Sequence, residues 1–367
     1  MKLCIIYNFA QHYRSEIFQA IDAEYDCDFF FGDSYLDVKK MDYALIKNGK
    51  VTEVRNRYLG PAIYQEGIPS LMRKYDTFLM TGETHAISTW LFLFYSRFFR
   101  NKHIYFWNHG WYGKETKMQT WLKKVFYKMT TGIFVYSYYA KDLMEKAGIP
   151  ADKVHVIHNS LAYSKQIEVR KQLSVLPIYK AHFCNDNPNL MFVGRLTPVK
   201  KLDMILRAMH ICKQQGKYYN MTFIGGGEMM EELKALTKDL GLEEQVWFYG
   251  PCYDEKILGD MIYNADLCVA PGNVGLTAMH TMVFGCPVIT HNDFKWQMPE
   301  FEAIRDGMTG CFFTNGDLDS LVVQINKWFE QKSDKREDVR EACMKEIDDN
   351  WTPAFQMSVF RKNIKFN

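Results

Sequence analysis

Short apolar runs separated by longer amphipathic stretches recur along the whole chain. Most of the runs are unbroken rather than alternating, which is typical of strands buried on both faces of a parallel sheet. In the first half, the expected strands are residues 2–7, 27–31, 77–80, 103–107, 133–136 and 154–157. In the second half, they are residues 190–193, 221–224, 246–249, 267–270 and 287–290.

The stretches between these runs predict helices. One apolar stripe has spacings of three and four and is formed by Met118, Trp121, Leu122, Val125, Phe126 and Met129. Residues 228–240 carry a second stripe, after which Gly241 suits the end of a helix. Because strands and helices alternate on this scale, we expect parallel sheets with helices on both faces.

The length of 367 residues suits two domains better than one core. The pattern weakens near residues 161–189, where a cluster of turn formers predicts a linker. We therefore expect an α/β protein with two Rossmann-like, doubly wound domains facing a cleft. Their expected bounds are 1–165 and, including the linker, 166–345, followed by a helix in 346–367 that could cross back to the first domain.

Charge and cysteine content narrow the class of protein. A net charge of +2 argues against a general nucleic-acid binder. Nine cysteines lie singly, without a C-x-x-C pair, so we expect reduced, mostly buried thiols and a cytoplasmic protein rather than a disulfide framework or zinc site. The first apolar run is too short for a signal peptide, and the most apolar stretch, residues 90–95, is far too short to span a bilayer.

The first candidate site follows the expected strand 190–193. Gly194 would turn the chain, and Arg195 and Lys200 would lie between the strand and the next helix. Two cations in this place suit a pyrophosphate, which arginine can bind through two hydrogen bonds. Two solvated cations on a surface turn are the alternative.

Two further strands also end in glycine-bearing loops. After residues 221–224, Gly225 and Gly227 would let the backbone approach a ligand closely. After residues 246–249, a planar base could rest against the turn formed by Tyr249, Gly250 and Pro251. Each loop taken alone could equally be a tight structural turn.

A fourth loop follows residues 267–270. There Asn273, Gly275, Leu276 and Thr277 lead into a helix whose free amides and positive dipole end could face a phosphate. Ligands of parallel sheets bind beyond the carboxyl ends of the strands. The four loops together therefore predict a nucleoside diphosphate site.

These stretches resemble the nucleotide-sugar half of retaining glycosyltransferases of the GT-B fold, in particular family four, also called glycosyl transferases group 1. The family's G-R-L-x-x-x-K motif corresponds to GRLTPVK at residues 194–200, and its G-x-G loop to residues 225–227. Its A-D pair corresponds to residues 265–266, and its A-x-G-x-P-V ending to VFGCPV at 283–288. The resemblance is specific over residues 190–313 and looser across the first half.

One departure from the family is large. The signature carries two glutamates separated by seven residues, and this sequence has Gly272 and His280 in their places. In the family, the first glutamate is associated with the sugar hydroxyls and the second with the ribose. The neutral ring of His280 could hydrogen-bond a ribose hydroxyl, although a core histidine is the alternative. Because the surrounding glycines and cations are intact, we interpret the change as a family variant.

In the first half, the resemblance implies a catalytic role for His109. This role is in addition to those expected of Arg195 and Lys200. The family often places a histidine-glycine pair after this strand, with the histidine near the donor sugar, and here His109 precedes Gly110. A turn histidine that caps a helix is the alternative.

The loops after the first and third expected strands of this half are expected on the acceptor side. The candidate residues there are Phe9, Tyr13 and Glu83.

Basic residues gather around the 90–95 run and the 118–129 stripe. They are Arg97, Arg100, Lys102, Lys114, Lys117, Lys123, Lys124 and Lys128. A basic, aromatic first domain could rest on an anionic membrane, which suits a lipid-linked acceptor at its inner face. A helix with an ordinary solvated lysine face is the alternative.

The resemblance implies transfer of a hexose from a nucleotide-diphosphate sugar to a saccharide or lipid-linked saccharide, with retention of configuration and without metal or cofactor. Surface polysaccharide or lipopolysaccharide synthesis is a common family role. The alternatives are a nucleotide-sugar epimerase of the same fold and a non-catalytic nucleotide-sugar-binding relative. A dehydrogenase is disfavoured because Met230 stands where G-x-G-x-x-G requires its third glycine.

Overall fold

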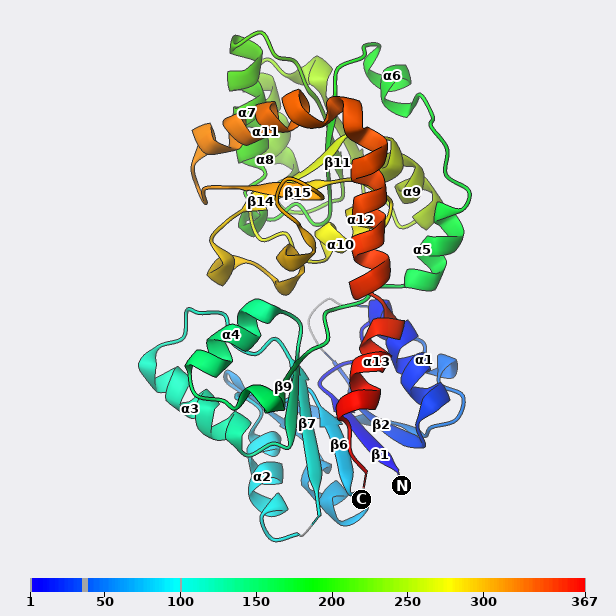
Figure 1. The fold of residues 1–367 in the computed structure, drawn as a ribbon, viewed down its shortest axis with the longest axis vertical. Coiled ribbons are helices and arrows are strands. Elements are labelled where there is room, and N and C mark those ends of the chain that lie inside the picture. The colour runs from blue at the N-terminus through cyan, green and yellow to red at the C-terminus, as the bar shows by residue number, and fades with distance from the viewer. Residues whose placement is uncertain (1, 35–38, 100, 367) are drawn as a thin grey trace. The chain divides into compact units, whose positions relative to one another are not determined.

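The computed structural model describes residues 2–34, 39–99 and 101–366. The chain divides into two compact units (Figure 1). Unit 1 comprises Met1–Tyr163 and Thr352–Asn367, and unit 2 comprises Ser164–Trp351. Each unit is built on a parallel sheet with helices on both faces, so the expected α/β class is confirmed.

Unit 1 holds a sheet in the order β3-β2-β1-β6-β7-β8-β9, in which every neighbouring pair is parallel. Its strands are β1 (Leu3–Tyr7), β2 (Cys27–Gly32), β3 (Val51–Val54), β6 (Thr77–Met80), β7 (His103–Asn108), β8 (Gly132–Val135) and β9 (Val154–Val156). A separate antiparallel hairpin joins β4 (Asn56–Leu59) to β5 (Ala62–Gln65).

Two hydrophobic cores cover the two faces of this sheet. Successive residues of β1 alternate between them, because side chains of a strand point to opposite faces in turn. One core receives α2 (Ile87–Ser96), α3 (Lys117–Lys128) and α4 (Tyr138–Lys146). The other receives α1 (Ser15–Glu24) and the last helix, α13 (Pro353–Asn363).

Helix α13 is an integral part of unit 1. The ring of Phe360 lies 4.8 Å from that of Phe134 and 5.2 Å from that of Trp107. Gln356 donates to the carbonyl of His158 at 2.8 Å. The boundary expected between residues 345 and 346 falls inside the preceding helix, α12 (Arg336–Asn350), which lies in unit 2.

Unit 2 holds six parallel strands in the order β12-β11-β10-β13-β14-β15. The strands are β10 (Asn189–Val193), β11 (Asn220–Ile224), β12 (Val246–Gly250), β13 (Leu267–Ala270), β14 (Val288–His291) and β15 (Gly310–Phe313). The helices between and after them are α7 (Asp203–Gln214), α8 (Met230–Asp239), α9 (Glu255–Asn264), α10 (Leu276–Met282), α11 (Leu318–Lys332) and α12.

The strand order of unit 2 reverses between β10 and β13. From β10 the chain winds outward through β11 and β12, and it then returns to β13 and winds the other way. Ligands of doubly wound sheets bind at such a switch point, beyond the carboxyl ends of the strands. The topology therefore singles out the loops that follow β10 and β13.

Every expected strand is present, with each end displaced by at most one residue. The segment expected as a linker instead contains α5 (Tyr163–Arg170) and α6 (Ile178–Phe183). All nine cysteines are free and seven of them are buried, in keeping with the expected thiols. Within the described ranges, none of the helices combines the length and the apolar character that crossing a bilayer requires.

Candidate functional site

The loops that follow β10 and β13 are bonded to each other at the switch point. The hydroxyl of Thr277, in the first turn of α10, donates to the carbonyl of Val193 at the end of β10, at 3.0 Å. The structure thus brings the Arg195 loop and the Gly275 loop together, as parallel pairing of β10 and β13 requires.

The loop after β11 joins the same assembly through its backbone. The amide of Leu196 donates to the carbonyl of Gly226 at 2.9 Å. A Cβ at Gly225 would overlap the carbonyl of Gly194, and one at Gly227 would overlap that of Leu196. Glycine is therefore required by the close approach of the two loops. Packing between the loops therefore accounts for Gly225 and Gly227 without a bound ligand.

The turn after β12 lies beside this loop. The amide of Gly225 donates to the carbonyl of Gly250 at 2.9 Å, and Pro251 is exposed. The ring of Tyr249 packs edge-on against that of Trp247, with centroids 5.3 Å apart. The turn expected to support a base is therefore next to the glycine loops, as the order of the strands dictates.

Lys200 is held against the loop that follows β13. Its ammonium donates to the backbone carbonyl of Asn273 at 2.7 Å and to the side-chain oxygen of the same residue at 2.8 Å. The pKa of Lys200 is lowered to about 8, chiefly by burial; Glu300 opposes this shift and the nearby Arg195 adds to it. At pH 7 the lysine therefore carries most of its charge in a partly buried position.

Arg195 differs from Lys200 in being exposed. Over the described ranges, its guanidinium makes no hydrogen bond or ion pair with a protein group. Its five donors are thus available to an external anion, and their planar arrangement matches a phosphate.

Gly272 fills the place of the family's first glutamate for a steric reason. Its amide donates to the carbonyl of Lys200 at 2.9 Å, and a Cβ would overlap the carbonyl oxygen of Val199. Its φ lies outside the left-handed region, so packing and not backbone conformation requires glycine here. No larger side chain fits while Lys200 keeps its position.

His280, in place of the second glutamate, is paired with a carboxylate from another helix. Its Nε2 lies 3.0 Å from Oε1 of Glu255, the first residue of α9, and Gln166 donates to the same oxygen at 3.0 Å. Burial raises the pKa of Glu255, but the hydrogen bonds from His280 and Gln166 outweigh it, and the pKa lies below its usual value. About a quarter of the Glu255 side chain remains accessible.

In unit 1, the ends of β1, β7 and β8 enclose a buried cation. Arg14 donates to the hydroxyl of Tyr7 at 3.0 Å and to that of Tyr136 at 2.7 Å. Its guanidinium carbon lies between 5.1 and 5.6 Å from the ring centroids of Tyr7, Trp107 and Tyr136. The rings of His109 and Tyr136 are in edge contact, with centroids 4.9 Å apart.

The pKa of His109 is lowered to about 4, chiefly by burial and in addition by the charges of Arg14 and Lys123. The ring is therefore neutral near pH 7. It can donate one hydrogen bond and accept another there, but it cannot act as a cation.

This shift predicts a pH-dependent stability. Because the unfolded His109 titrates near pH 6.5, the unfolded chain takes up a proton before the folded one as the pH falls. We expect the free energy of unfolding to fall by about 2–3 kcal/mol between pH 6.5 and pH 4 through this group. Urea unfolding across that range should show a smaller decline in His109→Gln, and an unchanged slope would contradict the shift.

The acceptor-side candidates lie near the switch point of unit 1, between β1 and β6. Phe9 is buried, whereas Tyr13 is partly exposed. Burial raises the pKa of Glu83, and His85 and Lys123 oppose the shift. A cavity beside Glu83 has a volume of only about 10 Å³, which is enough for one water molecule and not for a sugar.

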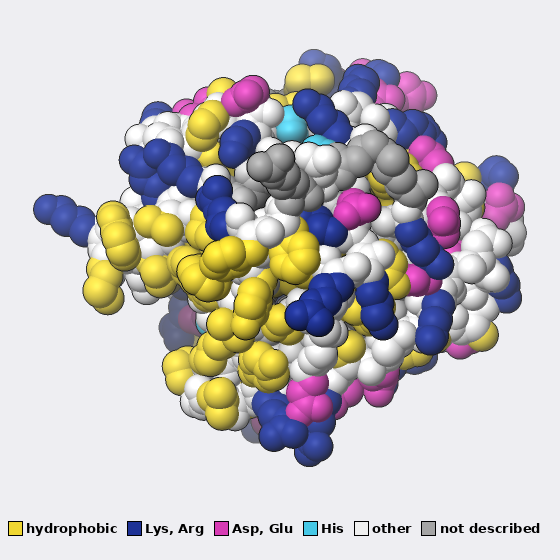
Figure 2. All heavy atoms as spheres, turned by 90° about the horizontal axis from the view of Figure 1, so that it is seen from below, with side chains coloured by type: hydrophobic (Ala, Val, Ile, Leu, Met, Phe, Trp, Pro, Cys, Tyr) yellow, Lys and Arg dark blue, Asp and Glu magenta, His cyan; other side chains and the backbone are white. Residues whose placement is uncertain are grey.

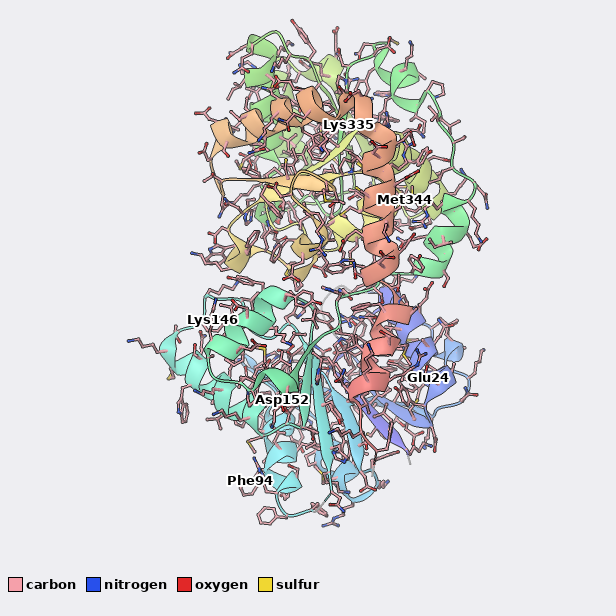
Figure 3. The ribbon with its side chains drawn as sticks, viewed as in Figure 1. Glu24, Phe94, Lys146, Asp152, Lys335 and Met344 are labelled. Carbon is pink, nitrogen blue, oxygen red and sulfur yellow. The ribbon has the colours of Figure 1, made fainter. Side chains whose placement is uncertain are left out.

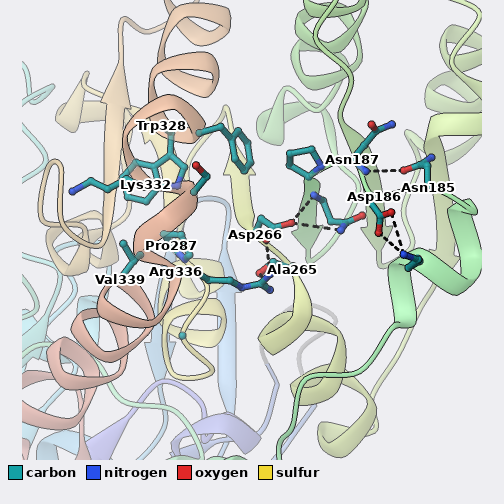
Figure 4. A pocket seen from close by; sticks show the side chains of 16 residues that line it. Asn185, Asp186, Asn187, Ala265, Asp266, Pro287, Trp328, Lys332, Arg336 and Val339 are labelled. Atoms are coloured by element: carbon teal, nitrogen blue, oxygen red, sulfur yellow. Dashed lines mark hydrogen bonds and ion pairs between the residues drawn. The ribbon is translucent and has the colours of Figure 1, made fainter.

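A larger cavity, of about 300 Å³, lies at the opposite edge of the unit 2 sheet (Figure 4). Its lining includes Asn189 at the start of β10, and Asp266, which precedes β13. The carboxylate of Asp266 pairs with Arg336 at 2.7 Å and accepts the amide of Asn189 at 2.8 Å. The A-D pair of the family motif therefore joins strand starts and lies away from the glycine loops.

Comparison with solved structures defines the fold. A structure of HepE from Anabaena in complex with UDP has a TM-score of 0.70, 16% identity and coverage of 99% of both chains. The apo form of the lipopolysaccharide outer core galactosyltransferase WaaB has a TM-score of 0.72, also with 16% identity and 99% coverage of both chains. The fold is that of GT-B glycosyltransferases.

Sequence comparisons find similarity to glycosyltransferases over part of the chain. Residues 177–346 match the model of the family described as glycosyl transferases group 1. The amylovoran biosynthesis glycosyltransferase AmsK of Erwinia amylovora is 27% identical over 198 residues, covering 48% of this chain and 46% of the relative. An uncharacterized glycosyltransferase of Methanocaldococcus jannaschii is 28% identical over 152 residues, covering 38% and 36%. The chain thus spans less than half the length of these relatives, and within the matched part it is similar to glycosyltransferases.

Proposed function

We propose that this protein is a retaining, metal-independent glycosyltransferase. It would move a hexose from a nucleoside-diphosphate sugar to a saccharide or lipid-linked saccharide, at the inner face of a membrane in surface polysaccharide or lipopolysaccharide synthesis. The observation that carries the proposal is the meeting of Arg195 and Lys200 with the glycine loops at the switch point of unit 2. The match of residues 177–346 to glycosyl transferases group 1 supports it.

The donor's diphosphate would lie between the two cations and the Gly275 loop. The Lys200 ammonium lies 3.9 Å from the position of a Cβ at Gly275. This cation and the backbone of the loop could therefore contact the same phosphate. The exposed guanidinium of Arg195 would complete the site with two parallel hydrogen bonds. HepE, a neighbour in fold, has been solved with UDP and with UDP-glucose, which supports a nucleotide-sugar donor.

Transfer would break the bond between the anomeric carbon and the terminal phosphate oxygen. The bonding electrons leave with the nucleoside diphosphate, where Arg195, Lys200 and the loop amides stabilise the growing charge. The acceptor hydroxyl attacks the oxocarbenium-like carbon from the face that the phosphate leaves, and the phosphate oxygen takes its proton. Neutral His109 would hydrogen-bond the donor sugar without adding a charge that opposes the cationic carbon.

Glu255 would make the ribose contact that the family signature gives to its second glutamate. The carboxylate is accessible, ionised and oriented by His280 and Gln166. In this arrangement His280 positions Glu255 through Nε2.

Replacing Glu255 by glutamine is therefore expected to raise the KM for the donor about tenfold while changing kcat little, because a uniformly used binding contact is lost. Initial rates at varied donor concentration measure both constants. Glu337→Gln, at a carboxylate on α12, is the matched control and should change neither. An unchanged KM in Glu255→Gln would remove Glu255 from the donor site.

The first test is thermal stabilisation by a panel of nucleoside diphosphates and their sugars, in the presence of a chelator and without acceptor. A ligand at a hundred times its dissociation constant should add about 2.7 kcal/mol to the free energy of unfolding. A selective shift with one base would support the donor site and identify its nucleotide. No shift with any member of the panel would overturn the proposal, and epimer formation without acceptor would replace transfer by epimerisation.

A further inference from the structure

Two helices of unit 1 carry apolar stripes that face solvent. On α2 and the turn that follows it, Ile87, Leu91, Phe94, Tyr95 and Phe98 recur at helical spacing, and Phe94 and Phe98 are 58% and 71% exposed. Figure 3 shows Phe94 pointing away from the body of the unit. These side chains are too large and too exposed to serve the core.

Helix α3 repeats the arrangement. Its periodicity predicts a stripe, but the structure turns most of that stripe outward: Met118 is 77% exposed and Trp121 64%, followed by Leu122 and Val125. Only Phe126 and Tyr127 of this helix are buried. The helix is therefore amphipathic with part of its apolar face unpartnered.

The two stripes belong to one side of unit 1. Helices α2 and α3 pack on the same core and touch through Trp90 and Phe126, whose ring centroids are 4.7 Å apart. Figure 2 shows hydrophobic side chains gathered over one part of this end of the unit, with lysine and arginine side chains at its border. We call the exposed side chains of residues 87–98 and 118–125 the α2–α3 face.

The charged residues of the segment that forms this face are almost all basic. Residues 86–128 contain eight lysines and arginines but a single acid, Glu115, and Arg100 is the one cation among them outside the described residues. Glu115 is ion-paired with Lys123 at 2.7 Å, and Lys102 is paired with Asp76 from outside the segment. A second copy of this face would meet it with charge of the same sign, so charge complementarity favours an anionic occupant.

We propose that the α2–α3 face docks on a bilayer that contains anionic lipids. Phe94, Phe98, Met118 and Trp121 enter the boundary between headgroups and acyl chains, where aromatic side chains are favoured. The surrounding lysines and arginines bind the headgroup phosphates. The docking deepens the membrane location given in the proposed function, but it requires no donor site, so its test can fail independently of the transfer activity.

Co-flotation of the full chain with lipid vesicles tests the proposal. We expect binding to phosphatidylcholine vesicles that contain phosphatidylglycerol, weak binding to phosphatidylcholine alone, and weaker binding at high salt. The double variant F94S/W121S should lose about tenfold in affinity, with an unchanged thermal midpoint because both side chains are exposed. Val323→Ser, at a 58% exposed valine on α11 of unit 2, is the matched control and should bind as the parent chain does.

A second variant separates charge from apolar insertion. K117E/K128E should lower binding to the anionic vesicles while leaving the residual binding to neutral vesicles unchanged. Absence of binding to anionic vesicles would overturn the proposal, as would equal binding to both kinds. A dimer in free solution that F94S/W121S dissociates would assign the face to a second copy instead. The stabilisation by nucleotides is measured on the same variants without lipid, so its presence or absence reports on the donor site alone.

Discussion

Replacing Arg195 by alanine is expected to lower the rate of transfer by about two to three orders of magnitude, the effect of removing one donor that stabilises transition-state charge. The thermal midpoint should stay unchanged, because the exposed guanidinium makes no bond to protein groups in the described ranges. Arg195→Lys should recover part of the rate, since it keeps the charge but loses the planar pair of donors. Single-turnover rates at saturating donor measure the effect directly.

Arg207→Ala is the matched control for this variant. Arg207 is an accessible arginine of the same unit that pairs with Asp203 on α7. Its replacement should leave transfer unchanged. Full activity in Arg195→Ala would show that the diphosphate binds elsewhere, whereas a falling thermal midpoint would show that the arginine is structural.

Restoring the family's first glutamate, by Gly272→Glu, is expected to damage the protein. Any Cβ at this position overlaps the Val199 carbonyl, so the loop that carries Lys200 must move and the bond from the Gly272 amide to Lys200 is lost. We expect a loss of about 3 kcal/mol in the free energy of unfolding, the upper range for overpacking. Stabilisation by the nucleotide should disappear with it, because Lys200 leaves its place.

Gly241→Ala is the control for the cost of a glycine substitution in itself. Gly241 has a positive φ of 61° and open space around it, so alanine there costs only the backbone strain, about 1–2 kcal/mol. Urea unfolding compares the two variants. If Gly272→Glu proved as stable as the parent chain and still bound nucleotide, the packing at Gly272 would not account for the missing glutamate.

The second glutamate is excluded by charge rather than by space. A carboxylate at position 280 would face that of Glu255, which lies 3.0 Å from the histidine that stands there now. Two carboxylates at that distance cannot both ionise without a large cost. The absence of both signature glutamates is thus matched by local packing at Gly272 and by the carboxylate of Glu255 beside His280.

The sequence predicts most of the fold because strands covered on both faces are uninterrupted apolar runs. Strands β3 and β4 escaped prediction because they are short and largely accessible, and β15 because its four residues follow directly on a recognised motif. Periodicity also located α3 but not its orientation. An apolar stripe shows that a helix has one hydrophobic side, and it does not show what covers that side.

The candidate site, like the fold, could be predicted from the sequence only in part. Its loops could be predicted because each follows a strand, and parallel strands end at one edge. The partners of those loops could not, because they come from elsewhere in the chain. Glu255 reaches His280 from α9, and Gln297 holds the signature loop by accepting the Val274 amide at 2.9 Å. Arg14 lies in a loop that was singled out, but its cage of aromatic rings forms only in the fold.

The return of α13 to unit 1 has a consequence for how the protein is made on the ribosome. Met357, Phe360 and Ile364 complete one of the two cores of unit 1, yet they are synthesised after the whole of unit 2. The earlier segment of unit 1 must therefore wait for α13 before its core is closed, whereas unit 2 can finish folding in between. During that interval the apolar surface that will receive α13 stays exposed, and a chaperone that binds apolar segments can recognise it.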